Sequence, residues 1–222
     1  YTLTRSSAAS DVYKRQGLAL AGHGRARCDA DDDDAIDPTV MRLFLGFAPD
    51  SGEGRALYAL SERLDLDDLA PLGWVPPENW HLTLAFLGEV GAQRLGELVS
   101  CVEEGLAGAR ACRQPLDRLS WFPAPEKARM LVVEGDLEPA LETLHRDCVA
   151  ALRREGFAIE KRRYRPHLTL ARYRGSRRTF SPPPLPPVRA VPLSLEQLTL
   201  YESRPGTRAP VYTPLHQFEL AR

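Results

Sequence analysis

Two short segments of the sequence carry the residues best suited to chemistry. His81-Leu82-Thr83-Leu84-Ala85 recurs 86 residues later as His167-Leu168-Thr169-Leu170-Ala171. The alternation of polar residues with leucines predicts a strand in each case, and residues two apart in a strand point to the same face, about 6–7 Å apart. Each copy therefore presents an imidazole and a hydroxyl on one face and leucines on the other. We predict a duplicated fold that brings the two copies side by side across a pseudo-twofold axis, with a cleft between them.

Two histidines that face one cleft suit a reaction in which one proton is removed and another is supplied. The ordinary pKa of histidine, about 6.5, allows one ring to be neutral while the other is protonated near pH 7. The two threonine hydroxyls are neutral donors for phosphate oxygens, so this set predicts an in-line displacement at phosphorus without a metal. The alternatives are a solvated strand face and a zinc site. A catalytic zinc ion takes three protein ligands, and neither strand holds an Asp, Glu or Cys at ligand spacing.

With their flanks, the two segments resemble the paired His-x-Thr-x motifs of the 2H phosphoesterase superfamily. Within it they are most similar to the RNA 2′,3′-cyclic phosphodiesterases, also called 2′-5′ RNA ligases. The similar stretches span nearly all of residues 41–222, and they are Met41 to Phe44, Glu78 to Glu89, Arg165 to Arg172, Leu200 to Ser203 and Tyr212 to Leu215. The resemblance implies hydrolysis of an RNA 2′,3′-cyclic phosphate end to a 2′-phosphate, with 2′-5′ ligation as a further activity. It implies neither a cofactor nor a metal.

The resemblance also assigns roles to individual residues. His81 would be the proton donor to the leaving 3′ oxygen, and His167 the proton acceptor from the attacking water. Thr83 and Thr169 would bind oxygens of the phosphate. Arg172, five residues after His167, matches an arginine that the family uses at the phosphate. An odd separation in a regular strand would point Arg172 to the opposite face from His167, so this assignment requires the strand to twist or end there.

The order of the predicted elements indicates an α+β fold with two pseudo-symmetric lobes, each an antiparallel-rich sheet with helices on the outside. Helices are predicted over 52–65, 91–107 and 137–155. Strands are predicted over 42–48, 74–75, 80–87, 115–122, 129–134, 166–173, 194–202 and 212–220. The proline-rich connector 181–187 can form neither a helix nor a central strand. We expect residues 41–222 to form a single bilobal domain.

Composition limits the class of protein. The 222 residues are 43% hydrophobic and 27% charged, which is ordinary for a globular protein, and no stretch reaches the roughly 18 apolar residues that span a bilayer. The four cysteines lack C-x-x-C spacing, which favours reduced thiols and a cytoplasmic location. Residues 1–40 differ from the rest, with a polar run near the start and four consecutive aspartates at 31–34. We expect them to be a disordered leader or a sequencing artefact ahead of Met41.

The distribution of charge agrees with an anionic polymer as substrate. The net charge of −1 argues against a broad grip on duplex nucleic acid, but residues 153–178 hold ten basic residues against Glu155 and Glu160. Such contacts supply affinity for phosphates and little sequence preference. Phe86, Trp121 and Phe122 are candidates to stack a terminal base, or else core residues. The expected partners are single-stranded RNA ends, tRNA fragments among them, with no membrane partner, and the protein is expected to be a monomer.

Two alternative functions use the same residues. In the first, the catalytic groups act on a small cyclic nucleotide or a 2′-5′ oligonucleotide, for which the basic stretch would matter less. In the second, the cleft holds an RNA end without turning it over. The presence of both histidines and both threonines favours an enzyme over such a binding protein.

Overall fold

The computed structural model describes residues 40–64, 72–173, 182–207 and 209–222. The expected leader, apart from Val40, lies outside these residues, as do Arg174, Arg177 and Arg178 of the basic stretch. No helix among the described residues is both long enough and apolar enough to cross a membrane.

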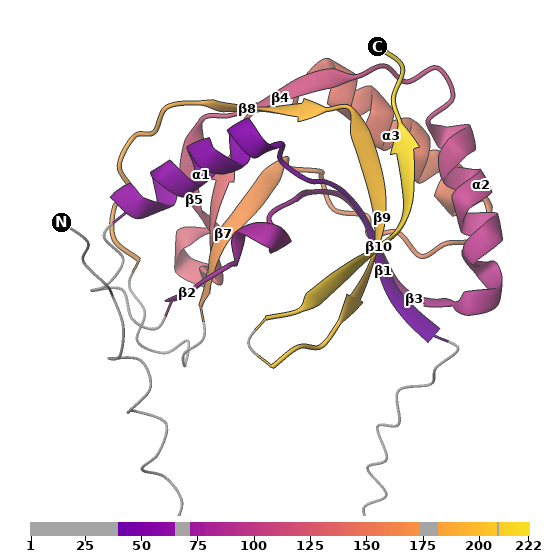
Figure 1. The fold of residues 1–222 in the computed structure, drawn as a ribbon, viewed down its shortest axis with the longest axis horizontal. Coiled ribbons are helices and arrows are strands. Elements are labelled where there is room, and N and C mark those ends of the chain that lie inside the picture. The colour runs from indigo at the N-terminus through magenta and orange to yellow at the C-terminus, as the bar shows by residue number, and fades with distance from the viewer. Residues whose placement is uncertain (1–39, 65–71, 174–181, 208) are drawn as a thin grey trace, which may run out of the picture. The chain divides into compact units, whose positions relative to one another are not determined.

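An antiparallel sheet of eight strands dominates the fold (Figure 1). Its strands, in spatial order, are β10 (Val211–Glu219), β9 (Gln197–Arg204), β1 (Val40–Phe47), β3 (Leu82–Gly91), β7 (His167–Tyr173), β6 (Met130–Glu134) and β5 (Arg118–Phe122), with β2 (Leu72–Trp74) also paired to β7. The join between β3 and β7 is narrow, because the ladder there consists of the pair Leu82 and Leu168. Four strands lie on each side of this join, which confirms an α+β fold with an antiparallel-rich sheet in each of two lobes.

Within the described residues, three α-helices accompany the sheet: α1 (Ser51–Arg63), α2 (Leu95–Gly105) and α3 (Pro139–Arg154). Asp50 starts α1, because its carboxylate accepts hydrogen bonds from the backbone N–H groups of Gly52 and Glu53, each at 2.7 Å. The Glu53 carboxylate in turn accepts the N–H of Asp50 at 2.9 Å, which completes a capping box. The helices α2 and α3 pack against each other, and α1 lies against β8 (Val191–Leu195) (Figure 1).

Two predicted strands are each divided in the structure. The run predicted at 115–122 consists of β4 (Cys112–Leu116) and β5, separated at Asp117, and the run at 194–202 consists of β8 and β9, separated at Glu196. The strands β4 and β8 pair in a second, two-stranded sheet, so the chain changes sheets at both breaks. The helix predicted from residue 91 begins at Leu95, because β3 continues to Gly91.

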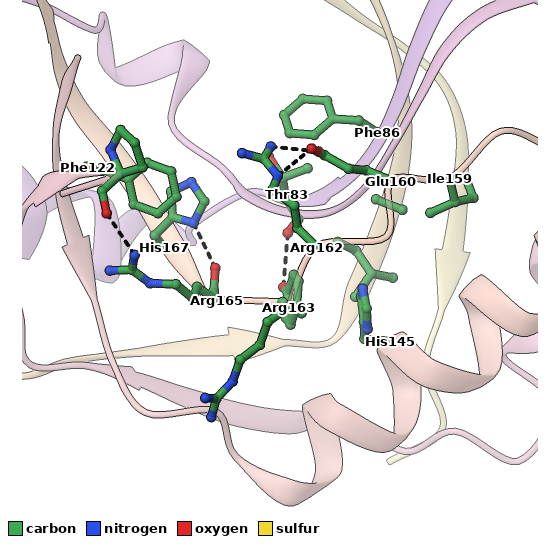
Figure 2. Close-up of a pocket in the computed structure, with 14 residues that line it drawn as sticks. Thr83, Phe86, Phe122, His145, Ile159, Glu160, Arg162, Arg163, Arg165 and His167 are labelled. Carbon is green, nitrogen blue, oxygen red and sulfur yellow. Dashed lines mark hydrogen bonds and ion pairs between the residues drawn. The ribbon is translucent and has the colours of Figure 1, made fainter. Parts of the chain in front are cut away.

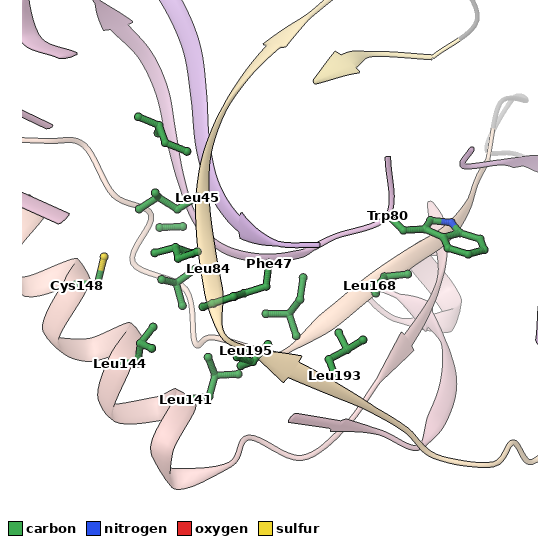
Figure 3. Packing of buried hydrophobic residues seen from close by; sticks show 14 of the residues in the cluster. Leu45, Phe47, Trp80, Leu84, Leu141, Leu144, Cys148, Leu168, Leu193 and Leu195 are labelled. Atoms are coloured by element: carbon green, nitrogen blue, oxygen red, sulfur yellow. The ribbon is translucent and has the colours of Figure 1, made fainter. Parts of the chain in front are cut away.

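The leucines of both repeats form part of a single buried hydrophobic cluster. Leu82, Leu84, Leu168 and Leu170 are all buried, as the alternation in the sequence predicts. Figure 3 shows Leu84 and Leu168 within this cluster, together with Leu141 and other side chains of α3. Because the leucine face is in the core, the histidines and threonines are directed to the other face of the sheet.

Candidate active site

The pair Leu82 and Leu168 fixes how the two repeats face each other. In an antiparallel ladder, the residues on either side of one member of a pair face those on either side of the other. His81 is therefore across from Thr169, and Thr83 is across from His167. All four side chains are partly buried. The two repeats thus bring two imidazoles and two hydroxyls to one face, as the sequence predicted.

Each repeat contains a β-bulge at the same position. Thr83 pairs with Gly46 and Ala85 with Leu45, so Leu84 is an extra residue in β3. In the second repeat Thr169 pairs with Val132 and Ala171 with Leu131, so Leu170 is an extra residue in β7. A bulge of this kind redirects the side chains that follow it, and such bulges are common next to active sites.

The bulge in β7 allows Arg172 to share a face with His167, although the two residues are separated by an odd number of positions. The leucine and alanine at the bulge are both buried, and the alternation then resumes with Arg172 on the exposed side. The Arg172 guanidinium lies 3.2 Å from the sulfur of Met130, and the Thr169 hydroxyl lies 3.8 Å from the same atom. The bulge is therefore the kind of irregularity that the assignment of Arg172 to the phosphate requires. Phe86 occupies the equivalent position in the first repeat and is 53% exposed.

The two histidine rings are oriented by equivalent hydrogen bonds. Nδ1 of His81 lies 2.7 Å from the carbonyl oxygen of Asn79, and Nδ1 of His167 lies 2.7 Å from that of Arg165 (Figure 2 shows the second). A carbonyl oxygen can only accept, so Nδ1 carries the hydrogen in each ring. Nε2 of each ring is then left to take up or release a proton.

An aromatic ring packs against each histidine. Phe44 lies against His81 with ring centroids 4.7 Å apart, and Tyr212 meets the same imidazole edge-on at 5.2 Å. Phe122 stacks on His167 with centroids 4.4 Å apart and ring planes 19° apart (Figure 2). These contacts hold each imidazole plane in one orientation. No sequence pattern singled out Phe44 or Tyr212, apart from their place in the stretches that carry the resemblance.

Asn79 and Arg165, each two positions before a histidine, also form hydrogen bonds to neighbouring loops. The Asn79 side chain donates to the carbonyl of Pro210 at 2.8 Å, and Arg165 donates to the carbonyl of Pro123 at 3.1 Å. Arg165 also forms a two-pronged ion pair with the buried Glu134, at 2.8 and 3.1 Å. Its guanidinium lies 4.8 Å from the centre of the Phe122 ring. The buried Glu134 carboxylate thus holds Arg165 in place. The Arg165 carbonyl in turn orients the His167 ring, and its guanidinium lies beside the Phe122 ring that stacks on His167.

Burial makes both histidines harder to protonate in the free protein. Desolvation lowers the pKa of His81 to about 4, against a contribution from the Asn79 carbonyl that raises it, and the positive charges of Arg172 and His167 lower it further. Desolvation also lowers the pKa of His167, while the Arg165 carbonyl and the Glu134 carboxylate raise it.

The three aromatic candidates for stacking differ in their surroundings. Trp121 is 5% exposed and donates its indole N–H to the carbonyl of Pro183 at 2.8 Å, so it is a core residue and not a stacking platform. Phe86 and Phe122, by contrast, both line a pocket beside His167 (Figure 2).

In the part of the chain that the structure describes, no group of three or more His, Cys, Asp and Glu residues could hold a metal ion.

The chain belongs to the LigT-like phosphoesterase family. The model of that family matches it twice, over residues 48–132 and 133–212, and each match contains one of the two repeats. The protein is therefore a phosphoesterase of the 2H superfamily.

Similar proteins of known name come from bacteria and archaea. An RNA 2′,3′-cyclic phosphodiesterase of Methanothermobacter thermautotrophicus is 27% identical over 184 residues, which are 81% of this chain and 99% of the relative. A protein of the same name from Geobacillus stearothermophilus is 29% identical over 149 residues, or 66% of this chain, but the match spans only 47% of that longer relative. Among solved structures, E. coli LigT in complex with 3′-AMP superposes with a TM-score of 0.68 at 23% identity, over 82% of this chain and 99% of LigT, which shows a shared fold.

Proposed function

We propose that this phosphoesterase is a metal-independent RNA 2′,3′-cyclic phosphodiesterase that leaves a 2′-phosphate. The observation that carries the proposal is the face that His81, Thr83, His167 and Thr169 share at the Leu82 and Leu168 pair. The names of the relatives support the substrate class, because both matched proteins described above are RNA 2′,3′-cyclic phosphodiesterases. The protein would act on RNA ends as a monomer in the cytoplasm.

In the proposed mechanism His167 is the general base and His81 the general acid. Nε2 of His167 takes a proton from water as the water oxygen bonds to phosphorus. The bond from phosphorus to the 3′ oxygen breaks, and Nε2 of His81 supplies the proton to that oxygen. General acid and base catalysis of this kind contributes about 10²–10⁴-fold each.

The lowered pKa of His81 has a role in this mechanism. His81 must carry a second proton to act as an acid, yet burial and the nearby positive charges lower its pKa to about 4 in the free protein. A bound phosphate anion opposes the effect of those charges and raises the pKa of His81. His81 would therefore gain its proton when the substrate binds. Arg172, Thr83 and Thr169 would donate hydrogen bonds to the non-bridging oxygens as negative charge develops there.

The decisive experiment is product analysis on an RNA that ends in a 2′,3′-cyclic phosphate. We expect conversion to a 2′-phosphate, with full activity after dialysis against EDTA. A 3′-phosphate product would contradict the assigned leaving group. Loss of activity in EDTA that zinc restores would contradict a metal-independent reaction.

Two comparisons separate this function from its alternatives. If a cyclic mononucleotide is hydrolysed as efficiently as a cyclic-phosphate oligonucleotide, the enzyme acts on small nucleotides, because the basic segment then adds nothing. If single-turnover experiments show binding of the RNA end and no product, the protein is a binding module. The same groups could join two RNAs through a 2′-5′ bond if a 5′-hydroxyl replaced water, which is the ligase activity that the resemblance implies.

A further inference from the structure

A methionine contacts both residues of the second repeat that the proposed mechanism assigns to phosphate oxygens. Met130, the first residue of β6, pairs with Arg172 of β7 on one side and with Phe122 of β5 on the other. Directly paired residues of neighbouring strands share a face of the sheet, so Met130 belongs to the face of the histidines and threonines. Its side chain is only partly buried, so solvent reaches it.

Two hydrogen-bond donors converge on the Met130 sulfur. The Arg172 guanidinium donates to it at 3.2 Å, and the Thr169 hydroxyl lies 3.8 Å from it. A thioether sulfur is a weak acceptor, whereas a phosphate oxygen accepts strongly because it is charged. A phosphate oxygen can therefore replace the sulfur as the partner of both groups. In the free protein Met130 keeps the two donors directed at one atom, close to where the substrate would need them.

The same sulfur can be oxidised. A hydroperoxide transfers one oxygen atom to Sδ of Met130: its O–O bond breaks, an S=O bond forms, the sulfur loses two electrons, and the peroxide is reduced to water or an alcohol. The product is polar, and its oxygen accepts hydrogen bonds far better than the thioether does. That oxygen is attached to the atom on which Arg172 and Thr169 already converge.

The other sulfur atoms of the described residues are placed differently. Met41 of β1 pairs with Val90, at the end of β3 that lies away from the repeat. Cys101 on α2 and Cys148 on α3 are buried, and Cys112 is in the two-stranded sheet. Met130 is therefore the sulfur through which an oxidant would act on the phosphate-binding groups.

We propose that Met130 is a regulatory oxidation site whose sulfoxide reversibly switches the phosphoesterase off. This inference rests on the proposed function, because it requires Arg172 and Thr169 to bind the phosphate. The sulfoxide oxygen holds both donors, and the substrate must compete for them. A hydrogen bond to a charged group is worth about 10- to 100-fold, so kcat/KM falls by about that factor. A methionine sulfoxide reductase removes the oxygen as water while a dithiol is oxidised to a disulfide, and activity returns.

The test compares each protein with itself before and after oxidation. Met41 and Met130 are the two methionines of the chain, so Met41→Leu is the matched control for Met130→Leu. Each protein is treated with hydrogen peroxide and then with dithiothreitol, which reduces oxidised thiols. Peptide mass spectrometry measures the oxygen added at Met130, and hydrolysis of a cyclic-phosphate RNA end gives kcat/KM.

Wild-type protein and Met41→Leu should lose about 10- to 100-fold in kcat/KM as Met130 is oxidised. Treatment with both methionine sulfoxide reductases, one for each sulfoxide epimer, should restore the loss. Met130→Leu should keep the kcat/KM that it had before peroxide.

A further variant measures the effect without an oxidant. Met130→Gln places an amide oxygen, a strong acceptor, near Arg172 and Thr169, whereas the leucine of Met130→Leu accepts no hydrogen bond. We expect kcat/KM of Met130→Gln to be about tenfold below that of Met130→Leu. Equal values would contradict competition between an acceptor at this position and the phosphate.

The remaining outcomes separate the inference from the proposed function. If the wild-type protein hydrolyses the cyclic phosphate and stays fully active with Met130 oxidised, the inference is wrong and the proposed function stands. The inference is also wrong if Met130→Leu loses as much activity in peroxide as the wild type, or if Met130 resists peroxide that oxidises Met41. Absence of any hydrolysis by the untreated wild-type protein would reject the proposed function, and the inference with it.

Discussion

Phe86 and Arg172 occupy equivalent positions, each five residues after the histidine of its repeat and each directed to the exposed side by a bulge. The repeats are identical from the histidine to the alanine, and they differ where the bulge ends. One half of the site thus carries an aromatic ring and the other a guanidinium group.

Replacing either histidine should remove most of the activity. His81→Gln and His167→Gln are each expected to lower kcat by about 10²–10⁴-fold, the usual contribution of a general acid or base. His216→Gln is the control, because His216 lies on β10 and its ring packs on Phe218, 4.6 Å away. Hydrolysis of a cyclic-phosphate RNA end provides the measurement. If His81→Gln and His167→Gln both turn over substrate at the wild-type rate, the proposed acid and base mechanism is wrong.

Arg172→Gln should affect both activity and the titration of His81. Loss of a guanidinium group at the phosphate is expected to cost about 10²-fold in kcat, as removal of one oxyanion donor does. The positive charge of Arg172 lowers the pKa of His81, so its removal should raise that pKa. NMR titration of the histidine ring carbons checks the second effect. Arg42→Gln, at an exposed position of β1, should change neither quantity. An unchanged His81 pKa would show that Arg172 does not face this histidine.

Glu134→Gln should impair His167, its cross-strand neighbour in the ladder between β6 and β7. The Glu134 carboxylate raises the pKa of His167, so its loss should move the His167 pKa, and the acid limb of the pH–rate profile with it, to lower pH. Arg165 would also lose its buried partner, and the resulting misplacement of His167 should lower kcat about tenfold or more. The control Asp136→Asn removes the same charge from a side chain that is 92% exposed and pairs with Arg118. If both substitutions behave alike, Glu134 has no positioning role.

The buried histidines should make the protein less stable in acid. His81 has a pKa of about 4 when folded and about 6.5 when unfolded, so the unfolded chain binds more protons between these values. Stability therefore falls as the pH drops through this window, and His81 alone should account for about 2 kcal/mol between pH 7 and pH 5. Urea unfolding of the wild-type protein and of His81→Gln at both pH values tests this. The substituted protein should lose correspondingly less stability, and equal losses would contradict the assignment.

The sequence predicted the face shared by the histidines and threonines, because each repeat combined the two-residue period of a strand with residue types suited to catalysis. Identical segments in two halves of a chain predict equivalent positions, and the alternation of leucine with polar residues determined which face each side chain takes. The bulges could not be predicted, because an extra residue in a ladder depends on the partner strand and leaves the local pattern unchanged. The placement of Arg172 was therefore ambiguous until the pairing of β6 with β7 was known.

Long-range contacts account for the remaining differences. Glu134 meets Arg165 because β6 lies beside β7. The two residues are 31 positions apart, and no periodic pattern in the sequence predicts that they form an ion pair. The strand breaks at Asp117 and Glu196 were missed for a related reason. A change of hydrogen-bonding partner between two sheets takes one residue and need not interrupt the alternation of apolar side chains.

The difference between the residues that follow the two bulges would give the proposed reaction a direction. With identical flanks, either histidine could serve either proton transfer, and a bound phosphate could be attacked from both sides. Both rings have an aromatic neighbour, but the first repeat is followed by the exposed Phe86 and the second by the exposed Arg172, so the two approaches to phosphorus would be chemically unlike. A framework built from two copies of one motif would then present different groups to the oxygen that leaves and to the water that enters.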